Sequence, residues 1–79
     1  MSNYEKYKKI FEKLFNVSGE NLSNLKYQDV PEWDSVGHME LITELEDAFD
    51  IEMETDDIID FNSFEVGLTL LKNKYNVEF

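Results

Sequence analysis

The stretch Glu32–Asp50 reads EWDSVGHMELITELEDAFD and decides the fold. Side chains that suit a protein interior recur through it at intervals of three and four residues, the spacing of one helix face. They are His38, Leu41, Ile42, Leu45, Ala48 and Phe49. The sequence therefore predicts a helix that packs this face on a core and ends near Asp50.

The start of this helix is marked by Asp34. A carboxylate just before the first turn accepts hydrogen bonds from free N–H groups, so Asp34 is predicted to be the N-cap. Ser35 then takes the first helical position, with its hydroxyl beside the positive end of the helix. A phosphate group attached there would face unpaired N–H groups and a favourable dipole.

The outward face of the same helix carries two apolar side chains, Val36 and Met39, beside the serine. Polar and acidic residues surround them: Glu40, Thr43, Glu44, Glu46 and Asp47. A face that is merely solvated seldom places two apolar residues next to a serine within a ring of carboxylates.

Charge is unevenly distributed along the chain. Eighteen acidic residues against seven lysines and no arginine give a net charge of −11 at pH 7. No basic residue lies between Tyr27 and Leu71, whereas thirteen of the acids lie between Asp29 and Asp60. Such a field repels nucleic acid and anionic membranes and attracts partners with basic patches. The alternative is a charge that serves only solubility.

Length and composition predict one small domain over residues 1–79. Cysteine is absent, which excludes a thiol nucleophile, a thiolate metal site and a disulfide. The chain has neither an apolar run long enough for a membrane span nor a start that resembles a signal peptide. We therefore expect a cytoplasmic protein without membrane insertion.

Three further helices are predicted outside the central stretch. Ser2–Phe15 forms the first, with Tyr4, Tyr7, Ile10, Phe11 and Leu14 on its inner face. A long connection at Asn16–Trp33 comes next, in which Trp33 is expected to pack inward.

The second half of the chain supplies the other two helices. Thr55 is the expected cap of a helix of one or two turns. A last helix begins near Asn62 or Ser63 and runs to about Tyr75, with Phe64, Leu68, Leu71 and Tyr75 on its inner face. The predicted fold is all-α, a small antiparallel four-helix bundle of three longer helices and one short helix. Its packing faces are formed by Phe11, Leu14, Leu41, Ile42, Leu45, Phe49, Leu68 and Leu71.

Catalytic and metal-binding patterns are weak. His38 is the only histidine, and a Ser35–His38 dyad would require the imidazole to reach back along the helix. The acids around Asp56 lack the spacing, the central glycine and the final glutamate of an EF-hand. We expect neither an enzyme nor a dedicated metal site.

The motif Asp34-Ser35-Val36 resembles that of the acyl carrier protein family, in which an Asp-Ser-Leu-like motif opens an acidic second helix. The resemblance extends over nearly the whole chain. It implies that a phosphopantetheinyl transferase, using coenzyme A and magnesium, attaches 4'-phosphopantetheine covalently to Ser35. The arm would then carry acyl groups as thioesters in fatty acid, polyketide or related lipid biosynthesis.

Two departures from the family pattern favour a specialised role over a housekeeping one. Trp33 stands where fatty-acid carriers often have a small residue, and Gly37-His38 follows Val36 where an acidic residue is common. A D-alanyl or peptidyl-type aminoacyl carrier stays open as an alternative. So does an acidic interaction module whose serine is never modified.

The resemblance also implies a docking surface for the transferase and for acyl-processing enzymes with basic patches. Its expected residues are Asp34, Val36, Met39, Glu40, Glu46, Asp47 and Ile58. The carrier itself is expected to be a monomer.

Overall fold

The protein is all-α in a computed structural model that describes residues 2–17 and 22–79. Its elements are α1 (Asn3–Phe15), a 3-10 turn η1 (Leu22–Asn24), α2 (Ser35–Phe49), α3 (Thr55–Asp60) and α4 (Phe64–Lys74). The predicted set of three longer helices and one short helix is confirmed. Within the described residues, no helix is both long and apolar enough to cross a membrane.

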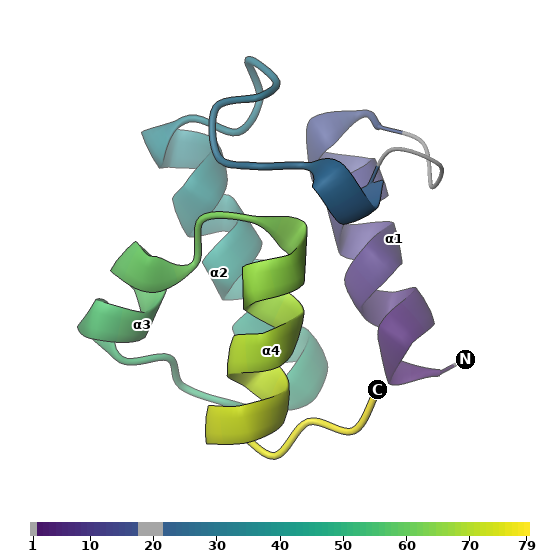
Figure 1. Ribbon diagram of the computed structural model, residues 1–79, viewed down its shortest axis with the longest axis vertical. Coiled ribbons are helices and arrows are strands. Elements are labelled where there is room, and N and C mark those ends of the chain that lie inside the picture. The colour runs from purple at the N-terminus through teal and green to yellow at the C-terminus, as the bar shows by residue number, and fades with distance from the viewer. Residues whose placement is uncertain (1, 18–21) are drawn as a thin grey trace.

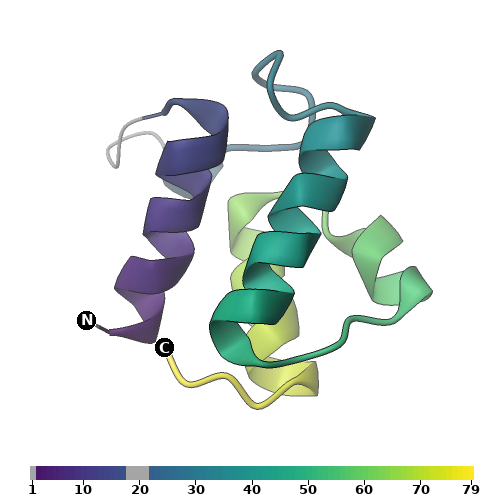
Figure 2. The same ribbon diagram turned by 180° about the vertical axis from the view of Figure 1, so that it is seen from behind.

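The helices form a small bundle in which α1 and α3 flank the pair α2 and α4 (Figures 1 and 2). Helix α1 runs antiparallel to both members of that pair. Helices α2 and α4 run in the same direction, because the segment that carries α3 returns the chain to the end where α2 begins (Figure 1). Both chain termini lie at the opposite end of the bundle, away from the start of α2.

Aromatic side chains form most of the core. Tyr7, Phe11, Phe15, Trp33, Phe61 and Phe64 are all buried. The indole of Trp33 stacks on the ring of Phe15, with the ring centroids 5.0 Å apart, so the inward packing expected of Trp33 is confirmed. The aliphatic residues Leu41, Ile42, Leu45 and Leu71 are buried as predicted. Leu14, Phe49 and Leu68 lie at the margin of the core and are only half-buried.

Backbone hydrogen bonds order the connection between α1 and α2. The N–H of Tyr27 donates to the carbonyl of Asn62, and the N–H of Phe64 donates to the carbonyl of Leu25, each at 2.9 Å. These bonds fasten the loop to the start of α4 before it turns toward α2. Residues 18–21 of the predicted connection lie outside the described residues.

Two local predictions are wrong. Tyr4 does not belong to the core: it is 41% exposed, and burial along α1 begins one turn later at Tyr7. Thr55 is not a cap but the first residue of α3, and the N-cap position belongs to Glu54. The Glu54 N–H donates to the Tyr75 hydroxyl at 3.0 Å, which fixes the backbone one residue earlier than expected.

Candidate functional site

The start of α2 places a serine hydroxyl on the surface. Asp34 is the N-cap, as predicted, and its carboxylate accepts from the N–H of Gly37 at 2.8 Å. Ser35 is the first helical residue and is exposed. None of the side-chain hydrogen bonds among the described residues involves its hydroxyl, so the aspartate caps the helix and leaves the serine free.

Gly37 allows the incoming loop to pass directly over the first turn of α2. A Cβ at this position would lie 1.9 Å from the carbonyl oxygen of Glu32. That contact is with backbone, so any side chain here must displace the loop that positions Asp34. The sequence signal was a glycine within the first turn of a helix, where glycine costs stability relative to alanine. The sequence analysis did not predict the close contact between Gly37 and the loop.

His38 ties the loop before Ser35 to α3. Its Nδ1 accepts from the indole N–H of Trp33 at 2.9 Å, and its Nε2 lies 2.8 Å from the carbonyl oxygen of Ile58. An indole N–H can only donate and a carbonyl can only accept, so His38 is the neutral tautomer with its proton on Nε2. With both ring nitrogens engaged, neither can act as a base toward Ser35.

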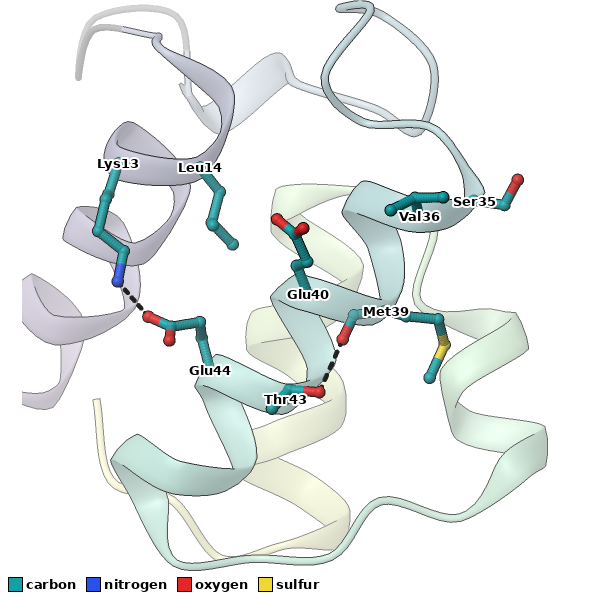
Figure 3. Close-up of a pocket in the computed structure, with 8 residues that line it drawn as sticks. All are labelled: Lys13, Leu14, Ser35, Val36, Met39, Glu40, Thr43 and Glu44. Carbon is teal, nitrogen blue, oxygen red and sulfur yellow. Dashed lines mark hydrogen bonds and ion pairs between the residues drawn. The ribbon is translucent and has the colours of Figure 1, made fainter.

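Three large apolar side chains are exposed near this end of α2 and on α3. Val36 is 68% exposed, Met39 51% and Ile59 71%. Figure 3 shows the Met39 side chain extending toward α3. Among the residues expected to dock partners, Ile58 is half-buried, and the exposed apolar residue of α3 is its neighbour Ile59. Sequence reasoning missed Ile59 because six residues are too few to set the phase of a helix.

A shallow groove of about 590 Å³ runs between α1 and α2 beside the serine (Figure 3). Leu14 and Val36 line it from opposite helices, and an ion pair between Lys13 and Glu44 bridges it. The Ser35 hydroxyl is directed away from the other side chains of the groove (Figure 3). A group attached to that oxygen therefore starts on the solvent side of the protein.

The carboxylates of the expected docking surface differ in what they contact. Asp34, Glu40 and Asp47 are exposed. Glu46 is half-buried, and its carboxylate accepts from the N–H of Met53 at 2.9 Å, which braces the loop between α2 and α3. Glu46 and the cap residue Asp34 thus each accept from a backbone N–H, a contact that the described structure does not show for Glu40 and Asp47.

Helix α3 is held against α4 by the one charged side chain in the described core, Asp57. Its carboxylate accepts from the Lys74 ammonium at 2.6 Å and from the Tyr75 hydroxyl at 2.5 Å. These hydrogen bonds hold the pKa of the Asp57 carboxyl below its ordinary value. The same contact raises the pKa of Lys74, and burial together with Asp57 raises the pKa of Tyr75. In residues 2–17 and 22–79, no group of three or more potential ligands is placed to hold a metal ion.

Fold and site together define a small helical protein that presents one serine hydroxyl at the capped start of an acidic helix. The chain is 36% identical over 76 residues to an acyl carrier protein of Buchnera aphidicola subsp. Schizaphis graminum (strain Sg), a match that covers 94% of this chain and 96% of that protein. No family model and no solved structure matches the chain. The chain belongs to the acyl carrier protein family.

Proposed function

We propose that Ser35 carries a covalent 4'-phosphopantetheine and that the protein presents acyl groups on this arm to enzymes of fatty acid, polyketide or related lipid biosynthesis. One observation carries the proposal: the carboxylate of Asp34 caps α2, which leaves the Ser35 hydroxyl exposed and unpaired within the described structure. Acyl carriers are not catalysts, so the reactions belong to the partner enzymes.

The residues at the start of α2 fit such a group. In the transfer, the Ser35 oxygen forms a bond to the phosphorus of the phosphopantetheine moiety of coenzyme A. The diphosphate bond breaks and releases adenosine 3',5'-bisphosphate, and the hydroxyl proton passes to a base of the transferase or to water. The N–H of Gly37 already donates to Asp34, but the N–H groups of the first two helical residues, Ser35 and Val36, have no partner within the helix and suit an added phosphate. When bound, the arm supplies a thiol that forms thioesters. The chain has no cysteine, so that thiol would be its only one.

Docking is proposed to combine charge with a small apolar contact. The carboxylates of Asp34, Glu40 and Asp47 steer a basic partner toward the serine, and Val36 and Met39 offer it an apolar surface. Glu46 and Ile58 complete the expected surface, to which we add the exposed Ile59. A net charge of −11 opposes self-association, so we expect the carrier to act as a monomer. We also expect it to be cytoplasmic.

Two alternative functions would use the same exposed residues at the start of α2. An aminoacyl carrier of the D-alanyl or peptidyl type would use the identical arm with a different cargo. An unmodified interaction module would use the exposed Val36 and Met39 without any arm.

Intact mass and thiol content separate a carrier from a module. The protein is incubated with coenzyme A, magnesium and a broad-specificity phosphopantetheinyl transferase. We expect a mass gain of one phosphopantetheine group and, from a thiol reagent, one thiol per chain where the untreated protein has none. An unchanged mass with no thiol would support the unmodified module instead.

A further inference from the structure

A positive charge lies beside the serine end of α2, and it comes from α1. Helix α1 runs antiparallel to α2, so its last turn lies near the start of α2 (Figure 2). Within the described residues, Lys13 in that last turn is the single basic residue that lines the groove between the two helices. Its ammonium pairs with the Glu44 carboxylate across the groove (Figure 3). The α1 side of the serine therefore carries a cation, whereas α2 itself has no lysine or arginine.

The ion pair between Lys13 and Glu44 changes what a basic partner meets on this side. The two side chains are 63% and 35% exposed, and pairs open to solvent to this degree add little to stability. Pairing offsets the charge of Glu44, and a partner's lysine or arginine would have to displace Lys13 to reach that carboxylate. Lys13 therefore weakens the attraction of this side for a basic partner.

The side of α2 toward α3 has no comparable cation. Asp56 and Asp60 on α3 are both exposed, and neither makes an ion pair among the described residues. The ammonium of Lys74 does contact α3, but it pairs with the buried carboxylate of Asp57. The exposed carboxylates on this side thus keep their full attraction for a basic partner.

Exposed apolar side chains favour the same side. Ile59 on α3 is 71% exposed, and the Met39 side chain extends from α2 toward α3 (Figure 3). On the α1 side, the apolar residue Leu14 is half-buried in the groove that the ion pair bridges. A partner that surrounds an apolar contact with lysine and arginine therefore fits the α3 side better in both charge and exposed apolar area.

We propose that Lys13 is a specificity-determining residue that keeps partners with basic patches off the α1 side of Ser35, so that they approach the serine over α2 and α3. This role rests on the proposed function and concerns how its partners are oriented. The first such partner is the phosphopantetheinyl transferase, which must reach the Ser35 hydroxyl. Lys13 acts through its charge and touches no reacting atom, because like charges placed opposite each other disfavour the wrong orientation.

The sign of the effect of Lys13→Gln tests this role. Modification of Ser35 is measured with coenzyme A, magnesium and the transferase, at low and at high salt. Lys13→Gln removes the repulsion and frees Glu44, so we expect kcat/KM to rise about two- to fivefold at low salt with kcat unchanged. The rise should disappear at high salt, which screens exposed charges. If Lys13 served only to join α1 to α2, its loss would instead lower the rate.

Two further variants and a matched control separate the local charge from the net charge. Glu44→Gln leaves Lys13 without its partner and should lower kcat/KM about two- to fivefold at low salt. The double variant of Lys13 and Glu44 restores the local charge and should return kcat/KM close to the wild-type value. Lys6→Gln removes the same charge from an exposed position about 10 Å further along α1, so it should have a smaller effect.

The α3 side is tested by removal of one carboxylate. Asp60→Asn should lower kcat/KM at low salt more than Glu5→Gln, which removes a carboxylate from the first turn of α1. Equal effects of these two variants would contradict an approach over α3.

A Lys13→Gln protein that is folded by circular dichroism but modified no faster than Lys6→Gln would overturn the role of Lys13. Failure of every protein to gain mass, the wild type included, would contradict the proposed function instead.

Discussion

Helices α2 and α4 begin with the same hydrogen bond but place their serines differently. At α4, the hydroxyl of Ser63 accepts from the N–H of Val66 at 3.0 Å. At α2, the carboxylate of Asp34 accepts from the N–H of Gly37 at 2.8 Å, and the serine follows one residue later. Because Asp34 rather than a serine is the cap of α2, the hydroxyl of Ser35 does not make this bond. A helix-start serine is therefore a candidate attachment site only when another residue caps the helix.

The residues just after each cap separate the two helix starts further. The first residue of α4, Phe64, is fully buried, whereas the exposed Ser35 opens α2 and Val36 follows it at 68% exposure. A glycine near each start admits a close neighbour, the loop backbone at Gly37 and two aromatic side chains at Gly67. The start of α2 is thus exposed to solvent beside its loop, whereas the start of α4 packs into the core.

The largest expected effect concerns the bundle that supports both starts. Leu45 is fully buried on the inner face of α2. Leu45→Ala should lower the free energy of unfolding by about 2–5 kcal/mol, because it removes buried methyl groups and leaves a cavity. Chemical denaturation measures the loss, with the exposed Val66→Ala as the control. A loss below about half a kcal/mol would mean that the inner face of α2 is misassigned.

The next largest loss of stability is expected when Gly37 or Gly67 is substituted. Gly37→Ala and Gly67→Ala should each cost about 1–3 kcal/mol, because the added methyl group meets atoms within 2.2 Å or less. Only Gly37→Ala displaces the loop beside Ser35, so it alone should also slow modification by the transferase. Unfolding curves and modification rates are measured on both variants. Equal modification rates would show that the loop over α2 does not position the serine.

Substitution of the two N-cap residues compares the starts of α2 and α4 directly. Asp34→Ala and Ser63→Ala should each cost about 0.5–2 kcal/mol, since both leave an N–H of the first turn without its partner. Modification should slow for Asp34→Ala and stay at the wild-type rate for Ser63→Ala. If both substitutions slow the modification of Ser35 equally, the effect comes from lower stability in general. The proposed difference between the starts of α2 and α4 would then be wrong.

The smallest expected effect is electrostatic. Reversal of Glu40 and Asp47 to lysine should slow modification at low salt, because exposed charge pairs contribute about 0–1 kcal/mol each and salt screens them. Glu65→Lys, in the first turn of α4, is the matched control and should have less effect. The transferase rate is compared at low and high ionic strength. A Glu40/Asp47 reversal without effect at low salt would mean that the acidic face serves only solubility.

Local sequence rules predicted the parts of the site that lie along one helix. The spacing from Leu41 to Phe49 indicated the inner face of α2, and Asp34 before Ser35 indicated where the helix starts. Both follow from helical periodicity and from the preference of carboxylates for the N-cap. The order of the four helices followed from the same patterns.

The remaining features depend on contacts between distant segments. Nothing in the sequence near His38 shows that Trp33 and the carbonyl of Ile58 meet it, because the position of α3 also depends on its distant contact with Lys74 of α4. The purpose of Gly37 appears only once the loop at Glu32 is seen above it. Short helices and chain ends, as at Tyr4, offer too few residues for a periodic signal.

The most direct test of Ser35 as the attachment site is the intact mass of two serine variants after treatment with coenzyme A, magnesium and the transferase. Ser63→Ala should gain one phosphopantetheine group, as the wild type does. Ser35→Ala should gain none while it keeps the helical circular dichroism of the wild type, because alanine suits a helix. A mass gain that survives Ser35→Ala, or one that is lost in a folded Ser63→Ala, would contradict the assignment of Ser35.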